Sequence, residues 1–335
     1  MNPADPESFN HRVEKLSTGR TYHFVDQIPN DYNTERTPTL LCVHGFPDLW
    51  YGWRHQIGPW VREGFRVIVP DMLGYGGTDK PFDASEYSTK KLCADLAAIL
   101  DLINVKRAIL IGHDWGSYTV GRFALWHPDR LTALIMLSVV YTPPSPKFHS
   151  MEDVVKLAPN LGYQLYFSSQ RSTADIEANL PKFLSFIYRQ PPSTSAPSIT
   201  SLGSFQTLLE NADIGLQPNI LAAQEMEYYL QEFKKGMNGS LNYYRTSKFR
   251  FDEEKAAGLP SKLRDDLPVL FIWGTDDPTV VPAAISKSHK FIARYQDIAL
   301  QGQRHWLMHE AKDEVAEKIS TWIKASTGFG LSSKL

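Results

Sequence analysis

The sequence predicts an α/β protein with a mostly parallel sheet, helices on both faces of that sheet, and an inserted helical lid. Two observations carry this prediction. Short apolar segments alternate with helical segments over residues 1–141, and the same pattern returns over residues 248–335. Residues 142–247 instead show helical periodicity, many aromatic side chains and proline-rich joints. Short buried strands that alternate with helices favour a parallel sheet with both faces covered.

The first part of the core is expected over residues 1–141. Its apolar runs are four to eight residues long in places such as FRVIVP, which is typical of buried strands. Residues 89–103 carry leucines and isoleucines at helical spacing. The expected strands are residues 21–25, 39–43, 65–70, 108–111 and 131–140, and the expected helices are 89–103 and 116–126.

The helical insertion is expected over residues 142–247, with one helix at 220–233. The second part of the core, residues 248–335, then supplies strands at 267–273 and 294–300 and a last helix at 312–324. In open α/β sheets, ligands bind at the carboxyl ends of the strands. An insertion that leaves the sheet from a strand end is therefore expected to cover the binding site.

The composition excludes several classes of protein. Apolar residues make up 42% of the 335 residues and charged residues 21%, which is typical of a globular chain rather than a disordered one. The formal net charge of −2 gives no basic field for nucleic acid. No apolar run approaches the roughly 20 residues that cross a bilayer, so no membrane insertion is expected. The chain is compatible with a monomer or a homodimer.

Local signals at the cysteines and the chain ends predict location. Cys42 and Cys93 are isolated from each other and have no metal-binding spacing, so two buried thiols are expected. The N-terminal residues contain no apolar stretch of the kind found in secretory signals. The final Ser333-Lys334-Leu335 matches a peroxisomal address, which predicts a peroxisomal protein if the source has peroxisomes and a cytoplasmic one otherwise.

The motif that bears most directly on chemistry runs from Gly112 to Ser117 (GHDWGS), between an expected strand and an expected helix. This is the context of a nucleophile elbow, a tight turn that lifts one side chain above the sheet. The residue at the apex is Asp114. A carboxylate can attack an sp³ carbon and form an alkyl ester, which water can then cleave at the carbonyl carbon. The alternative is that Asp114 caps the following helix.

A base and a second acid are expected later in the chain, in the order nucleophile, acid, histidine. The acid should follow a late strand, where Asp277 is the first choice and Asp276 the alternative. The base should lie in the loop before the last helix, where His305 is preferred to His309. The joint presence of all three groups in the required order favours a catalytic triad.

The turn His44-Gly45-Phe46-Pro47 is expected beside the elbow. The backbone N–H groups of Phe46 and Trp115 can both point at one carboxylate oxygen of Asp114 and form an oxyanion hole. A cis peptide bond is expected before Pro47. Structural roles are expected for His44 and for the histidine that precedes Asp114.

These motifs (HGFPD, GHDWGS, GTDD and RHW) together resemble the soluble epoxide hydrolases of the α/β-hydrolase fold family, over residues 20–325. In that family, two lid tyrosines point at the epoxide oxygen. The resemblance places Tyr163 in the first of these positions, within GYQLYF, and Tyr244 in the second, within NYYR. The family more often has Trp where this chain has Tyr243, which leaves Tyr243 as an alternative.

The resemblance implies that the chain converts a small-molecule epoxide and water to a vicinal diol, with no metal and no organic cofactor. A role in detoxification or in lipid epoxide metabolism would follow. An apolar pocket, and hence an apolar or aromatic substrate, is expected from aromatic residues near the motifs. These are Trp50, Tyr51, Trp53, Phe148, Tyr166 and Phe167. The alternatives are a haloalkane dehalogenase with the same aspartate, or a ligand-binding homologue without activity.

Overall fold

A computed structural model describes residues 1–190, 199–211 and 213–329 of the chain. Ser333-Lys334-Leu335 lies outside these described residues, so the peroxisomal address stays a prediction. Within the described ranges, no helix combines the length and the apolar character needed to cross a bilayer.

The core is an eight-stranded sheet in the order β1-β2-β4-β3-β5-β6-β7-β8. The strands β1 and β2, and β2 and β4, pair antiparallel, and every later pair is parallel. The strands are β1 (His11–Lys15), β2 (Thr21–Gln27), β3 (Thr39–Val43), β4 (Arg66–Pro70), β5 (Ala108–His113), β6 (Leu131–Leu137), β7 (Pro268–Gly274) and β8 (Arg294–Leu300). The mostly parallel sheet confirms the predicted fold class.

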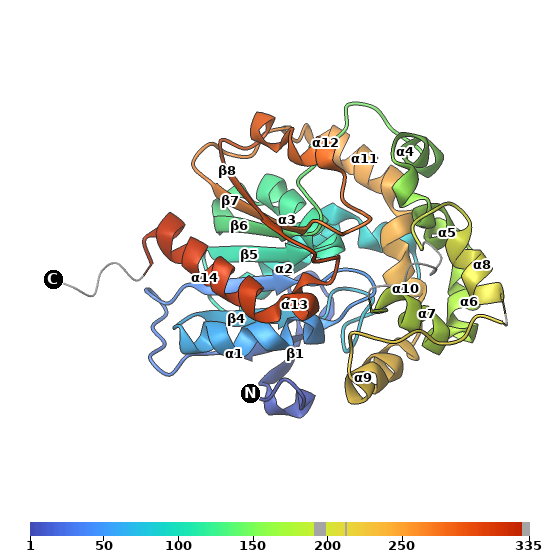
Figure 1. The fold of residues 1–335 in the computed structure, drawn as a ribbon. Coiled ribbons are helices and arrows are strands. Elements are labelled where there is room, and N and C mark those ends of the chain that lie inside the picture. The colour runs from blue at the N-terminus through green and yellow to red at the C-terminus, as the bar shows by residue number, and fades with distance from the viewer. Residues whose placement is uncertain (191–198, 212, 330–335) are drawn as a thin grey trace.

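Helices cover both faces of this sheet, as Figure 1 shows. On one face α1 packs against α14, and on the other α2 packs against α3. The helices of the core are α1 (Arg54–Arg62), α2 (Thr89–Leu102), α3 (Trp115–Trp126), α11 (Ser247–Ala257), α12 (Pro282–Ile285), α13 (Leu307–Glu310) and α14 (Lys312–Thr327). The buried strands between them form the hydrophobic core, because β3, β4 and β5 are buried at every position.

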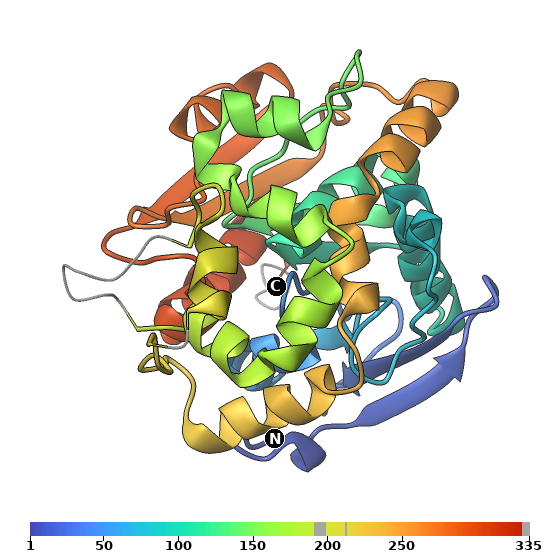
Figure 2. The same cartoon turned by 90° about the vertical axis from the view of Figure 1, so that its right-hand side faces the viewer.

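The inserted segment is helical, as predicted, and lies beyond one end of the sheet, at the right of Figure 1 and facing the viewer in Figure 2. Its helices are α4 (Met151–Leu157), α5 (Tyr163–Ser168), α6 (Ser172–Ala178), α7 (Leu180–Ile187), α8 (Ser204–Glu210), α9 (Ala223–Phe233) and α10 (Asn238–Leu241). We propose residues 142–247 as the bounds of this lid.

Hydrogen bonds from two buried tyrosines connect the lid to loops that follow the strands. The hydroxyl of Tyr188 donates to the carbonyl of Pro47 at 2.6 Å, and that of Tyr229 donates to Asp48 Oδ1 at 2.6 Å. The neutral bond of Tyr188 contributes about 1 kcal/mol, and breaking either bond leaves a buried acceptor unpaired. The lid is therefore held over the carboxyl ends of the strands by specific contacts.

Some elements differ from those expected. The strand β1 was not predicted, because its residues alternate only between exposed and partly exposed positions and give no buried pattern. The helix α1 was not predicted either, and it contains Pro59, which normally disfavours a helix interior. The strand β6 ends at Leu137 rather than at residue 140, because Ser138 has a φ of 64° that turns the chain out of the sheet.

Candidate active site

The elbow is a single residue between a strand and a helix. The strand β5 ends at His113, α3 begins at Trp115, and Asp114 between them has φ 54° and ψ −120°. A Cβ on Gly112 would lie 2.5 Å from the carbonyl carbon of Gly116, so only glycine allows the helix to start so close to the strand. The side chain of Asp114 makes no capping hydrogen bond to α3, which speaks against the alternative that it serves as a helix cap.

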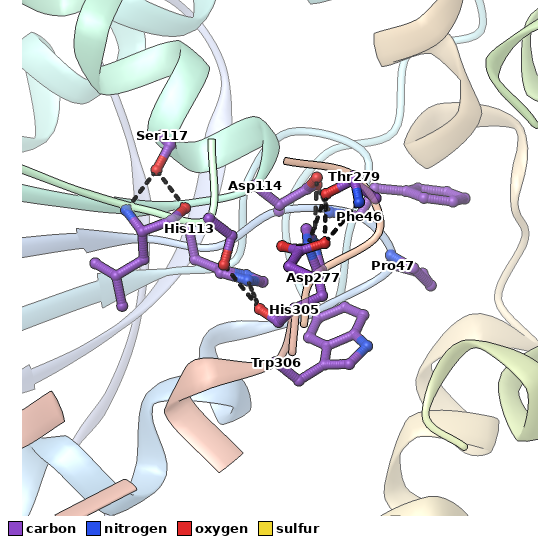
Figure 3. A network of polar contacts seen from close by, with 12 residues as sticks. Phe46, Pro47, His113, Asp114, Ser117, Asp277, Thr279, His305 and Trp306 are labelled. Atoms are coloured by element: carbon purple, nitrogen blue, oxygen red, sulfur yellow. Dashed lines mark hydrogen bonds and ion pairs between the residues drawn. The ribbon is translucent and has the colours of Figure 1, made fainter. Parts of the chain in front are cut away.

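The geometry brings a histidine and a second carboxylate to Asp114 (Figure 3). The Nδ1 of His305 lies 2.8 Å from Asp277 Oδ2, and its Nε2 lies 3.6 Å from Asp114 Oδ2. These residues follow β8, β7 and β5, so the carboxyl ends of three strands supply them. The arrangement brings together the three residues for which the roles of nucleophile, base and acid are predicted.

The two alternatives for the triad are placed elsewhere. Asp276 is exposed, and its Oδ1 accepts a hydrogen bond from the hydroxyl of Thr275. His309 lies within α13, and its Nδ1 lies 3.3 Å from Arg54 Nη1. The geometry therefore favours Asp277 and His305, the first choices from the sequence.

Further contacts hold Asp277 and His305 in place. The Thr279 N–H and hydroxyl donate to Asp277 Oδ1 at 2.8 and 2.7 Å. The carbonyl of His305 accepts from the Ser138 hydroxyl at 2.8 Å and lies 2.8 Å from His113 Nε2. Sequence reasoning missed Thr279 and Ser138. Only Thr279 had a local signal, because an aspartate commonly accepts a hydrogen bond from the N–H two residues later.

One of the two backbone N–H groups expected in the oxyanion hole contacts Asp114. The Phe46 N–H donates to Asp114 Oδ1 at 2.8 Å. The Trp115 N–H lies in the first turn of α3, where a backbone N–H has no acceptor within its own helix. The bond between Phe46 and Pro47 is cis, as predicted. Oδ1 is thus held by the backbone, whereas Oδ2 faces His305.

Of the two neighbouring tyrosines left open by the sequence, Tyr244 is the one that lines a cavity together with Asp114. Tyr244 and Tyr163 line one cavity with Asp114, and their ring centroids are 6.4 Å apart. The hydroxyl of Tyr243 instead donates to the carbonyl of Leu73 at 3.0 Å. Burial raises the pKa of both Tyr163 and Tyr244, and the Asp114 carboxylate raises both further. Both phenols therefore stay protonated at neutral pH.

Two cavities meet at Asp114. The larger has a volume of about 440 Å³ and the smaller about 70 Å³, and Asp114, Tyr163 and Thr279 line both. Of the aromatic residues expected in the pocket, Phe148 lines the larger cavity and Phe167 the smaller. The expectation was wrong for the others, which line neither cavity because they are buried in the packed interior: Trp50, Tyr51, Trp53 and Tyr166.

Asp114, His305 and Asp277 shift one another's pKa values. Burial raises the pKa of Asp114, but the hydrogen bond and charge of His305 outweigh it and leave that pKa below its ordinary value. Burial lowers the pKa of His305, but Asp277 and Asp114 outweigh it and raise that pKa to about 10. At neutral pH the resting site therefore holds an imidazolium between two carboxylates.

The pKa shift of His305 predicts a dependence of stability on pH. The pKa of His305 rises from its ordinary 6.5 to about 10 in the folded protein, so the protonated form stabilises the fold. That contribution is fully present below about pH 6.5 and is lost as the pH rises through about 10. We expect the difference in unfolding free energy between wild type and His305→Gln to shrink over this range. Urea unfolding at a series of pH values measures it, and a constant difference would contradict the raised pKa.

Comparison with known proteins gives the family. The model of the alpha/beta hydrolase fold family matches residues 38–312. The chain belongs to this family. A relative named Epoxide hydrolase A, from Mycobacterium tuberculosis, is 33% identical over 85% of this chain and 90% of its own length. Bifunctional epoxide hydrolase 2 of Mus musculus is 29% identical over 96% of this chain. The match spans only 57% of the length of that relative.

Solved α/β-hydrolase structures agree with the fold. The crystal structure of Epoxide Hydrolase A from Mycobacterium thermoresistibile has a TM-score of 0.79 and 28% identity, and the match covers 94% of this chain and 98% of that one. The epoxide hydrolase VrEH1 from Vigna radiata also has a TM-score of 0.79, with 27% identity over 96% and 99% of the two chains. The likeness therefore includes the lid as well as the sheet.

Proposed function

We propose that this α/β-hydrolase is an epoxide hydrolase that forms a covalent ester on Asp114. One observation carries the proposal: a carboxylate at the elbow lies beside an Asp–His pair and below two protonated phenols. The names of the relatives and of the solved structures support the same activity. The apolar part of the larger cavity supports an apolar or aromatic carbon skeleton in the substrate.

The first half-reaction opens the ring. Tyr163 and Tyr244 donate to the epoxide oxygen, and Asp114 Oδ2 attacks a ring carbon while the Phe46 N–H holds Oδ1. A C–O bond of the ester forms as the ring C–O bond breaks, and the ring oxygen takes a proton from a phenol. The product is a hydroxyalkyl ester of Asp114.

The second half-reaction releases the diol. Esterification removes the charge of Asp114, which is one of the causes of the raised pKa of His305. The imidazolium can then return a proton to the tyrosinate through water in the cavity. Neutral His305, oriented by Asp277, deprotonates a water that attacks the ester carbonyl, and Phe46 and Trp115 stabilise the oxyanion. The bond between the carbonyl carbon and the alkyl oxygen breaks, and this oxygen takes the proton of the newly formed carboxylic acid of Asp114. The diol leaves, and the carboxylate and the imidazolium are restored.

The phenols favour an epoxide over an alkyl halide. An opened epoxide leaves an alkoxide that needs a proton, whereas a departing halide needs none. Two buried phenols with raised pKa values suit the first requirement, because each holds a proton at neutral pH and lies in the cavity with the nucleophile. The dehalogenase alternative gives these hydroxyls no role.

The decisive experiment measures diol release from styrene oxide and a stilbene oxide, with halide release from 1,2-dibromoethane followed in parallel. Diol without halide supports the proposal. Halide without diol would replace it with the dehalogenase alternative. Neither product, from protein whose thermal unfolding is cooperative, would favour the ligand-binding alternative.

The two lid phenols give a further prediction. Tyr163→Phe and Tyr244→Phe are each expected to lower the rate of ester formation about 10²-fold, because each removes a donor to the developing alkoxide. Single-turnover kinetics measures this rate. Tyr243→Phe is the matched control: it removes a neighbouring hydroxyl that bonds Leu73, and it should keep most of the rate. Equal losses in all three variants would assign these tyrosines to packing.

A further inference from the structure

The larger cavity contains a buried cation that the proposed reaction does not use. Arg250 lies on α11, lines the cavity and is 9% exposed. Its guanidinium carbon stacks 4.9 Å from the ring centroid of Trp115 and 5.1 Å from that of Tyr118. The two aromatic rings fix the guanidinium in the cavity wall.

This guanidinium lacks a polar partner in the described part of the chain. Its Nη1 is buried without a hydrogen-bond acceptor, and no carboxylate among the described residues lies within ion-pair distance of it. Glu254, one helical turn further along α11, is instead paired with Arg122, whose Nε lies 2.6 Å from Glu254 Oε1. Two arginines thus face one glutamate in the wall of the same cavity.

An unbalanced buried cation is unfavourable unless an anion reaches it. Burial lowers the pKa of Arg250, which reflects the missing solvation of its charge. A guanidinium binds a carboxylate with two parallel hydrogen bonds, and Arg250 has its donors unused. The site is therefore built for the anionic end of a ligand.

The position relative to the nucleophile defines what kind of ligand fits. Asp114 and Arg250 line the same 440 Å³ cavity, and Trp115, on which the guanidinium stacks, directly follows Asp114 in the chain. The anionic end and the reacting carbon would thus lie in one cavity. The lining of this cavity is mostly apolar and includes Val139, Val140, Met151, Phe251 and Val280.

We propose that Arg250 is a specificity-determining residue that binds the carboxylate of an epoxide-bearing acid. The inference rests on the proposed epoxide hydrolysis for the reacting end, but the carboxylate site is a separate feature. It refines the expectation of a purely apolar substrate: the carbon skeleton is apolar and one end is anionic. The carboxylate stays intact in the reaction and serves to orient the epoxide toward Asp114.

Binding tests the carboxylate site without any turnover. Calorimetric titration compares a medium-chain alkanoate with the primary amide of the same length, which differs in charge but hardly in shape. Wild type is expected to bind the alkanoate roughly tenfold to a hundredfold more tightly. Arg250→Gln should remove this preference. Lys248→Gln is the matched control, because Lys248 lies on the same helix, pairs with Asp252 and does not line the cavity.

Equal affinity of wild type for acid and amide would overturn the inference, as would a preference that survives in Arg250→Gln. If Arg250→Gln does not fold, Arg250→Lys keeps the charge but loses the bidentate geometry, and should weaken the alkanoate preference only in part. An undiminished preference in that folded variant would place the anion elsewhere.

Turnover then separates this inference from the proposed function. The substrates are ω-epoxyalkanoates of increasing length, each compared with its methyl ester. We expect a higher kcat/KM for the acid at the length that spans from Arg250 to Asp114, and a fall of at least tenfold in the acid-to-ester ratio in Arg250→Gln. If wild type hydrolyses both the acid and the ester with an acid-to-ester ratio of kcat/KM near one, the carboxylate site is overturned, whereas the proposed epoxide hydrolysis is supported. If alkanoate binding depends on Arg250 but neither the acid nor its methyl ester is hydrolysed, the carboxylate site is supported and the proposed epoxide hydrolysis is overturned.

Discussion

Asp114→Ala is expected to abolish diol formation, with a loss in kcat on the order of 10⁴-fold or more. The reason is that no other described carboxylate can replace it: the turn with φ 54° places Asp114 alone between β5 and α3, beside His305. Asp277 is committed to the other side of the imidazole at 2.8 Å. Steady-state diol release from a trans-stilbene oxide measures the loss.

A matched carboxylate variant controls for nonspecific effects. Asp276→Ala removes an exposed carboxylate from the residue next to Asp277, and it should keep near-wild-type activity. Comparable losses in the Asp114 and Asp276 variants would contradict the assignment of the nucleophile.

Isotope labelling separates a nucleophile from a general base, which the alanine variant alone does not. In a single turnover in H₂¹⁸O, water attacks the ester carbonyl, so the label should enter the carboxylate of Asp114 and the diol should carry none. If Asp114 only activated water, the label would appear in the diol. Mass spectrometry of the diol and of the peptide that contains Asp114 distinguishes the two.

The placement of Asp114, Asp277 and His305 beside one another could be predicted because the signals in the sequence are local. Each group sits next to a strand end that the sequence marks by a buried apolar run, and parallel strands place those ends along one edge of the sheet. The elbow adds a steric requirement at Gly112 and Gly116 that is visible in the motif itself. The choice between Tyr243 and Tyr244 could not be made from the local sequence. It depends on a contact with a distant part of the chain, because the carbonyl of Leu73 accepts the hydroxyl of Tyr243.

Arg250 shows why other functional features stay hidden in a sequence. An arginine four residues before a glutamate on a helix normally predicts a solvent-exposed ion pair. Here Arg122, which lies on α3 and is far away in the sequence, forms the ion pair with Glu254. Arg250 is therefore left without a carboxylate partner among the described residues. The cavity-facing charge thus arises from a tertiary contact. The error over Trp50, Tyr51 and Trp53 has the same origin, because nearness in sequence to a site motif does not decide whether a ring faces the cavity or the core.

His305→Gln is expected to trap the ester intermediate. Ring opening uses Asp114 and the phenols, whereas ester hydrolysis needs the imidazole to deprotonate water, so the variant should slow the second step far more than the first. Intact-protein mass spectrometry after mixing with an epoxide should show one adduct with the mass of the substrate. The steady-state rate of diol release should fall on the order of 10⁴-fold.

The trapping experiment has to be run at a pH that keeps the nucleophile charged. The His305 cation holds the pKa of Asp114 down against burial, so its loss lets that pKa rise. Working near pH 8 is expected to keep Asp114 ionised in the variant. The double variant Asp114→Ala with His305→Gln should show no adduct. An adduct in the double variant would place the ester on another residue, and near-normal turnover of His305→Gln would assign the base elsewhere. Accumulation at Asp114 alone would show that two chemical steps share one carboxylate and that the imidazole serves only the second.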